Sequence, residues 1–189
     1  NLMKNLFATN NLKQTYYLVS PYPQNIMEKM AHGYWQEAEQ RVDTTSINGS
    51  WLQSAGAIVA TTNDLTYWQK YFYQSYIPFS LRNTINGKPV HSFNDIGYDF
   101  GSFRMNTPEG LIWFTPGLTT GYTTMIVYAP CLDVYFSYSA NLAPLNSFHK
   151  EMILGVLHEL NRNIHQHIAA PDYCAKLIHA KEFEFPKIG

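Results

Sequence analysis

The chain has 189 residues, of which 46% are hydrophobic and only 14% are charged, which fits a globular domain with a sizeable apolar core. Its formal net charge is −1, from 13 basic and 14 acidic residues, so no nucleic-acid partner is expected. No apolar stretch approaches the roughly 20 residues that a membrane-crossing helix needs, so we expect no membrane span in this chain.

Residues 1–53 are predicted to form a cover region of short helices and loops, with turn signals at SPYPQN and at Asn48-Gly49. The chain opens on Asn1, directly in a segment with helix-like apolar spacing and no cap before it. We therefore expect an N-terminal half of the same protein before Asn1. Residues 54–189 are predicted to form a helix, an antiparallel sheet and a C-terminal helix.

A helix is predicted after the turn Ser54-Ala55-Gly56. Thr61 is its expected N-cap, and Asp64, three residues on, is the expected capping-box partner. The apolar residues expected to face the core recur at helical spacing: Leu65, Trp68, Phe72 and Tyr76. A small hairpin is predicted at Asn86-Gly87.

From Gly97 the hydrophobic pattern changes to a period of two. It predicts consecutive antiparallel strands near residues 98–106, 110–115, 122–129 and 133–141, because the links between them are too short for crossover helices. A helix near residues 147–165 is expected to pack on one face of this sheet. Its apolar stripe comprises Phe148, Met152, Val156, Leu157, Leu160 and Ile164. The predicted fold class is α+β.

Two cysteines, Cys131 and Cys174, each adjoin a turn-like proline segment. They predict either a disulfide, as in an exported protein, or two unpaired thiols. No HExxH or CxxC spacing occurs, so neither a metal nor another cofactor is predicted. Aromatic residues make up 15% of the chain, which fits either core filling or a surface for sugars or peptides.

Four segments, in this order and spacing, resemble a known family: residues 11–17 (NLKQTYY), residues 31–34 (AHGY), residues 54–65 (SAG followed by TTNDL) and residues 117–130 (GLTTGYTTMIVYAP). They are similar to "G-M-x-x-T-x-F", "A-x-G-Y", "S-A-G-G-x-x-S-T-x-x-D-L" and "G-G-T-P-G-Y-S-S-x-x-x-Y-x-P". The chain thus resembles the C-terminal half of the serine β-lactamase and D-alanyl-D-alanine carboxypeptidase-like family, in its class C and esterase branch. The resemblance implies a partial β-lactamase/transpeptidase-like fold.

Members of this family acylate a serine in an S-x-x-K box, helped by a Y-x-N box and by a K-T-G or H-x-G box on the strand beside the cleft. The resemblance implies that the first two boxes lie before Asn1. The S-x-x-K match at Ser147–Lys150 falls downstream of the third box, and we interpret it as chance, with Ser147 as a helix-capping residue. No Y-x-N tripeptide occurs. We therefore expect this chain alone to show no hydrolysis.

The third box falls at Thr115-Pro116-Gly117, where Thr115 replaces the Lys or His of the family and Pro116 replaces a small hydroxyl residue. The resemblance implies that Leu118 offers its backbone amide to the oxyanion hole, beside a glycine that permits close approach. Thr115, Pro116, Gly117 and Thr119 are the candidate substrate-binding residues. This interpretation expects the strand to stop at Thr115, and the alternative is a plain hairpin turn over residues 115–121.

Two functions fit. In the first, the full-length protein is a serine hydrolase acting on an ester, an amide or a D-amino-acid peptide through an acyl-serine. In the second, it is a catalytically degenerate relative that binds a peptidoglycan-like or peptide ligand or a partner protein. The upstream sequence discriminates them, because only the first needs intact S-x-x-K and Y-x-N boxes. The family's peptidoglycan chemistry lies outside the cytoplasm, so a periplasmic or secreted location is expected.

Overall fold

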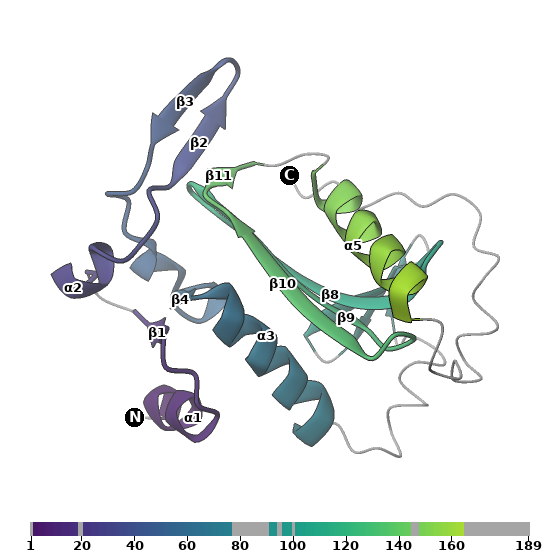
Figure 1. The fold of residues 1–189 in the computed structure, drawn as a ribbon. Coiled ribbons are helices and arrows are strands. Elements are labelled where there is room, and N and C mark those ends of the chain that lie inside the picture. The colour runs from purple at the N-terminus through teal and green to yellow at the C-terminus, as the bar shows by residue number, and fades with distance from the viewer. Residues whose placement is uncertain are drawn as a thin grey trace. The chain divides into compact units, whose positions relative to one another are not determined.

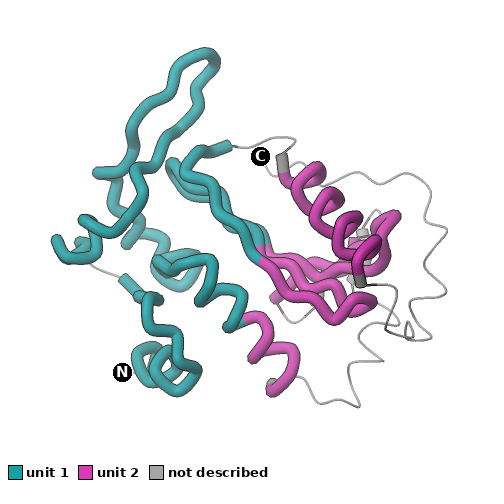
Figure 2. Tube along the Cα trace, in the orientation of Figure 1, with its two compact units in different colours: residues 1–68, 116–125, 137–145 teal, residues 69–115, 126–136, 146–189 magenta. Residues whose placement is uncertain are grey.

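The computed structural model describes residues 2–18, 21–76, 91–93, 96–99, 101–144 and 148–164. Two compact units alternate along the chain (Figure 2). Unit 1 comprises Asn1–Trp68, Pro116–Met125 and Ser137–Leu145, and unit 2 comprises Gln69–Thr115, Ile126–Phe136 and Asn146–Gly189. The predicted division of the chain after residue 53 stays a prediction.

Unit 1 begins with short elements. They are α1 (Leu2–Thr9), β1 (Thr15–Tyr17), α2 (Gln24–Met27), β2 (Tyr34–Glu37), β3 (Gln40–Asp43), the 3-10 helix η1 (Gly49–Ala55) and β4 (Ile58–Ala60). β1 pairs with β4 and β2 with β3, both antiparallel, while β11 (Leu142–Ala143) runs parallel to β2. The prediction of helices and loops alone for residues 1–53 is therefore wrong. These strands have three or four residues, and β3 is exposed throughout, so they lack the alternation that indicates a strand.

Helix α3 (Thr62–Tyr71) starts as predicted, because the Thr61 hydroxyl accepts a hydrogen bond from the Asp64 N–H at 3.3 Å. The capping-box half of the prediction is wrong. The buried Asp64 carboxylate accepts hydrogen bonds from the Gln14 N–H at 2.7 Å and from the Thr15 hydroxyl at 2.9 Å. This acidic residue therefore holds β1 against the start of the helix.

The main sheet has six strands in the order β10-β9-β8-β7-β6-β5. Their bounds are β5 His91–Phe93, β6 Ile96–Asp99, β7 Ser102–Thr107, β8 Gly110–Thr119, β9 Tyr122–Ala129 and β10 Val134–Ala140. Neighbours in sequence are neighbours in the sheet, and Figure 1 shows β8, β9 and β10 side by side. The predicted antiparallel meander is thus confirmed.

Two strand boundaries differ from the prediction. The strand expected near residues 98–106 is a hairpin of β6 and β7, in which Asp99 pairs with Ser102 and Gly101 has φ +75°. The alternating pattern does not reveal this turn, because a glycine reverses the chain within two residues. The strand expected to end at Thr115 continues as β8 to Thr119.

Unit 2 has an aromatic core. Leu111, Ile112, Trp113 and Phe114 of β8 are all buried, so both faces of this strand are covered. The Tyr73 ring lies 6.1 Å from the Trp113 ring and 4.7 Å from the Tyr128 ring, between centroids. These contacts join the sheet to the π-helical turn η2 (Phe72–Tyr76) that follows α3.

The predicted buried stripe of the first helix is partly wrong. Gln69 and Tyr73 are buried, whereas Leu65, Trp68 and Phe72 are half-buried, and the side chain of Tyr76 lies outside the described residues. With its amide suitably oriented, Gln69 donates to the Val127 carbonyl at 2.7 Å and accepts from the Tyr128 N–H at 3.1 Å. A polar residue is thus buried because it satisfies strand backbone groups, which spacing alone does not reveal.

Helix α5 (Phe148–Ile164) matches the predicted range and runs beside the unit 2 part of the sheet (Figure 1). Ile153 and Leu157 are fully buried. The Glu109 carboxylate, in the turn between β7 and β8, accepts from the Asn161 amide at 2.8 Å and lies 3.0 Å from His158 Nδ1. Polar contacts therefore fasten the helix to this turn.

Several expectations concern residues outside the described ranges: the hairpin at Asn86-Gly87, the S-x-x-K serine Ser147, and Cys174. Cys131 takes part in a disulfide, and its predicted pairing with Cys174 stays a prediction. In the described part of the chain, no helix is long and apolar enough to cross a membrane.

Candidate functional site

The C-terminal end of β8 extends past its ladder with β7. The last β7–β8 pair is Phe103 with Phe114, and β7 begins at Ser102, whose hydroxyl lies 3.0 Å from the Thr115 hydroxyl. Pro116 to Thr119 continue as strand beyond that point. The two earlier interpretations of this stretch, a strand that stops at Thr115 and a hairpin turn over residues 115–121, are both wrong.

The register indicates where the backbone groups of this strand end point. Thr107 and Gly110 flank a two-residue turn, so they form a hydrogen-bonded pair, and hydrogen-bonded pairs alternate along an antiparallel ladder. Gly110, Ile112 and Phe114 therefore direct their backbone groups toward β7. By the same alternation, Pro116 and Leu118 direct theirs to that side, past the last β7 pair.

This placement explains why Pro116 does not interrupt the strand. Proline has no N–H for a ladder, and it is tolerated in a strand at an edge. The Leu118 N–H, two residues on, points to the same side of β8. It is a hydrogen-bond donor on a strand segment that has run beyond its neighbour on that side.

Gly117 lies between these two residues and is exposed, while Leu118 and Thr119 are half-buried. A Cβ atom at Gly117 would lie 3.6 Å from the Thr124 Cβ, which is ordinary van der Waals contact. Packing within the chain therefore does not demand glycine here. The absence of a side chain leaves the backbone of β8 approachable on this face.

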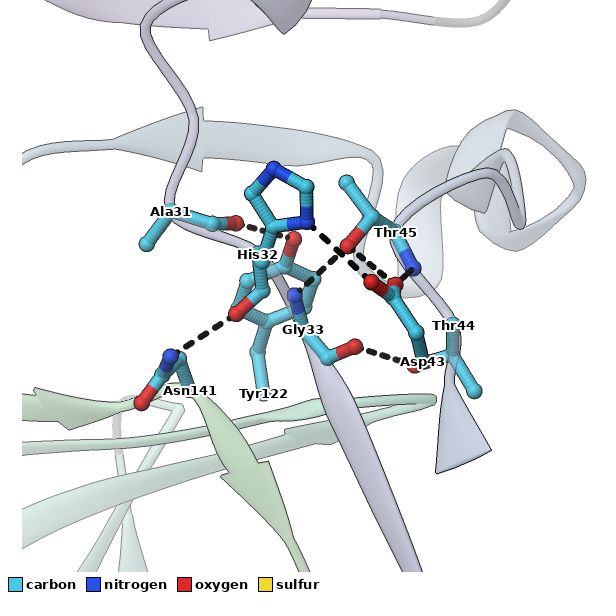
Figure 3. A network of polar contacts seen from close by, with 8 residues as sticks. All are labelled: Ala31, His32, Gly33, Asp43, Thr44, Thr45, Tyr122 and Asn141. Atoms are coloured by element: carbon cyan, nitrogen blue, oxygen red, sulfur yellow. Dashed lines mark hydrogen bonds and ion pairs between the residues drawn. The ribbon is translucent and has the colours of Figure 1, made fainter. Parts of the chain in front are cut away.

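The turn from β8 to β9, at Thr120-Gly121, is held by a polar network that the sequence did not predict (Figure 3). Gly121 is buried with φ +92°, and its carbonyl accepts from the Tyr34 N–H at 3.2 Å. The Tyr122 hydroxyl donates to the Ala31 carbonyl at 2.6 Å. The Asn141 amide donates to the His32 carbonyl at 2.8 Å.

The segment Ala31–Gly33 is fixed from its other side by residues that follow β3 (Figure 3). The Gly33 N–H donates to the Thr45 hydroxyl at 2.9 Å, and the Gly33 carbonyl accepts from the Thr44 N–H at 2.8 Å and from the Thr44 hydroxyl at 3.1 Å. We call the contacts of residues 31–34 with residues 43–45, 121–122 and 141 the turn clamp. All of these residues belong to unit 1.

Asp43 organises the exposed side of the turn clamp. Its carboxylate accepts from the Thr45 hydroxyl at 2.6 Å and from the Thr45 N–H at 2.9 Å, and it lies 3.1 Å from His32 Nδ1. These interactions, led by the Thr45 hydroxyl, lower the pKa of Asp43 from 3.8 to about 2.

Chemically, this end of β8 offers a backbone donor beside an open glycine. It lacks the side-chain cation or imidazole of the family's third box, because Thr115 is neutral and its hydroxyl lies against Ser102. Among the described residues, no group of three or more His, Cys, Asp or Glu side chains could hold a metal ion. The site therefore suits recognition and stabilisation of an oxygen atom by a backbone amide.

The antiparallel meander with its covering helices defines part of a β-lactamase/transpeptidase-like fold, in the α+β class. The D-amino acid amidase from Ochrobactrum anthropi SV3, solved with L-phenylalanine amide, is similar with a TM-score of 0.65 and 18% identity, over 86% of this chain and 50% of that one. A penicillin-binding protein homologue from Pyrococcus abyssi, described as octameric, has a TM-score of 0.58 and 17% identity, over 82% and 37%.

A D-stereospecific amidohydrolase from a Streptomyces species is also similar, with a TM-score of 0.60 and 16% identity, over 75% of this chain and 43% of that one. The chain thus spans half or less of the length of these three solved structures. No protein-family model matches it, and no curated protein does.

Proposed function

We propose that this chain is part of a serine hydrolase that cleaves an amide, an ester or a D-amino-acid peptide through an acyl-serine. In this proposal the nucleophilic serine and its base come from a segment outside this chain, and Leu118 donates its N–H to the developing oxyanion. The observation that carries the proposal is the direction of the Leu118 N–H, past the last β7 pair and next to the exposed Gly117.

The similar structures support the choice of substrate class. One of these structures is named a D-amino acid amidase and another a D-stereospecific amidohydrolase. Both share this part of the fold. An amide carbonyl attacked by a serine develops negative charge on its oxygen, which a backbone N–H on a rigid strand stabilises without moving. Thr115, Pro116, Gly117 and Thr119 would line the substrate along β8.

Labelling with a fluorophosphonate tests the proposal. The full-length protein should label at one serine and hydrolyse D-phenylalanine amide faster than the L-isomer, whereas this 189-residue chain should remain unlabelled. Substituting the labelled serine by alanine should abolish both signals. Stoichiometric labelling of the isolated chain at Ser147 would instead locate the nucleophile here.

A second candidate function has one observation in its favour. Thr115 stands where the family has Lys or His, and its hydroxyl faces Ser102 at 3.0 Å, so it supplies no charge. A protein that binds a peptide or peptidoglycan-like ligand without cleaving it fits that loss. Ligand binding without measurable turnover or labelling in the full-length protein would favour this function.

Export to the periplasm or the medium is part of the proposal. Its support is Cys131, which takes part in a disulfide, because disulfides persist in oxidising compartments. Thiol titration of the protein purified from its native compartment checks this. Free Cys131 in that material would contradict export.

A further inference from the structure

The turn clamp lies directly next to the proposed oxyanion donor along the chain. Leu118 is separated from Gly121 by Thr119 and Thr120, and Gly121 and Tyr122 make the clamp's contacts with residues 31–34. The two-residue turn Thr120-Gly121 fixes the register of β8 against β9. A displacement of Gly121 or Tyr122 should therefore shift the end of β8 as well. The clamp is therefore placed to set the position of the Leu118 N–H.

We infer that Gly33 and Tyr122 are positioning residues, which hold the β8–β9 turn so that the Leu118 amide points at the reacting oxygen. This inference rests on the proposed function. It joins a residue at the start of β9 to a segment far earlier in the chain, since Tyr122 and its partner Ala31 are separated by 91 positions.

Steric fit within the clamp is tight on both sides. A Cβ at Gly33 would lie 2.6 Å from ring atoms of Tyr122, and a Cβ at Gly121 would lie 2.8 Å from the Gly33 carbonyl carbon and would also collide with Thr44. Two glycines thus let residue 33 pass between the Tyr122 ring and the turn. A side chain at Gly121 must push the turn away from the Gly33 backbone, and a side chain at Gly33 must displace the Tyr122 ring from its place in the clamp.

Directional bonds complete the constraint. Five backbone groups of four consecutive residues, 31–34, are hydrogen-bonded: the carbonyls of Ala31, His32 and Gly33 and the N–H groups of Gly33 and Tyr34. The Tyr34 N–H is shared between the carbonyls of Gly121 and Asn141, at 3.2 and 3.0 Å. The turn is therefore fixed to a segment in which five of the eight backbone groups are hydrogen-bonded.

Packing around Gly117 supplies no comparable restraint. Gly117 is exposed, and its nearest contact for an added Cβ is the ordinary 3.6 Å to Thr124. An oxyanion donor must nevertheless hold its position closely, because a shift of about 1 Å in an active-site group can cost about 10²-fold in rate. The clamp supplies directional restraint at the turn that follows this exposed glycine.

The test uses the full-length protein with Gly33→Ala, Tyr122→Phe and the control Gly155→Ala, whose added methyl group meets nothing within 4 Å. Gly33→Ala should lower kcat for D-phenylalanine amide by about 10²-fold and leave KM unchanged, because the donor acts on the transition state. Tyr122→Phe keeps the ring, loses one hydrogen bond, and should lower kcat by about tenfold or less. Gly155→Ala should match the parent.

Amide hydrogen exchange of residues 116–121 supplies a readout that does not depend on turnover. Gly33→Ala and Tyr122→Phe should both accelerate exchange in this segment, and Gly155→Ala should not. If the parent is active, unchanged kcat in both clamp variants, or a rise in KM alone, overturns the positioning role. If the parent shows no turnover, the proposed function fails and the catalytic role of the clamp fails with it. Exchange then decides only whether the clamp restrains the turn: faster exchange in the variants supports that restraint, and unchanged exchange overturns it.

Discussion

Strands β8 and β9 are stabilised in different ways at their two ends. In unit 2, Trp113 and Tyr128 are buried against Tyr73 in an aromatic core. In unit 1, Gly121 and Tyr122 are held by hydrogen bonds to residues 31–34. Apolar burial contributes a large free energy to folding but has no preferred direction. Each hydrogen bond contributes a modest free energy and is directional. The comparison teaches that an aromatic core stabilises one end of the strand pair, whereas directional hydrogen bonds fix the turn at the other end.

Removing the aromatic core should give the largest effect. Trp113→Ala deletes a fully buried ring and should lower the free energy of unfolding by about 3–5 kcal/mol. Trp51→Ala, at a side chain that is 67% exposed in unit 1, should change it by about 0.5 kcal/mol or less. Urea denaturation of both variants measures the difference. Equal losses would contradict the assignment of stability to the aromatic end.

Two glycines with left-handed backbones separate strain from crowding. Gly121→Ala, at φ +92° against Gly33 and Thr44, should cost roughly 1–2 kcal/mol for backbone strain and about 1–3 kcal/mol for overlap. Gly101→Ala, at φ +75° with nothing within 4 Å, should cost only the strain. Thermal and urea unfolding report both values. If the Gly101 variant were as unstable as the Gly121 variant, crowding in the turn clamp would contribute nothing to stability.

Gly117 tests the open face of β8. In the full-length protein, Gly117→Val should lower turnover by about 10²-fold, because a side chain would block close approach of the substrate. Its fold should survive, since a Cβ there is in ordinary contact at 3.6 Å. Leu118→Ala is the matched variant and should keep most activity, because only the backbone of Leu118 is used. Retained turnover in Gly117→Val would show that substrate does not approach here.

The Thr115–Ser102 pair should matter little for turnover, because a neutral hydroxyl cannot replace a lost cation. In a double-mutant cycle of Thr115→Ala and Ser102→Ala, we expect a coupling energy of about 0.5–1.5 kcal/mol in stability, as for one hydrogen bond. Steady-state kinetics of Thr115→Ala should match the parent. If Thr115→Ala abolished turnover while Gly117→Val did not, the family's third box would not lie at residues 115–117.

Asp43 should give the smallest effect, and its sign is fixed. The pKa of this carboxyl is lowered from 3.8 to about 2 in the folded protein, so the stability it contributes is present above pH 3.8 and is lost as pH falls through about 2. Asp43→Asn lacks this titrating carboxyl, so its stability should fall slightly less than that of the parent as pH drops from 3.8 to about 2. The control is Asp133→Asn, at an exposed residue with φ +49° where Asn is tolerated. Identical acid unfolding of parent and Asp43→Asn would contradict the expectation.

The elements that follow from local patterns were predictable from the sequence. Alternation over residues 122–129 and helical spacing over residues 147–165 match β9 and α5, because each depends on one face being apolar. The Thr61 cap is local too, since its bond to the Asp64 N–H spans three residues. Short exposed strands such as β3 and the two-residue turn after β6 leave no such pattern and were missed.

The candidate site divides in the same way. The order of motifs in the sequence by itself predicted a site at residues 115–119 and a resemblance, carried in part by Gly33 and Gly121-Tyr122, to a family pattern. Only the tertiary structure decided that β8 continues through Pro116, and hence that the Leu118 N–H points past β7. It alone joined Tyr122 to Ala31 and Asn141 to His32, across 91 and 109 positions. The physical reason is that hydrogen-bond direction depends on register and on partners distant in the chain, which a one-dimensional pattern of polarity does not encode.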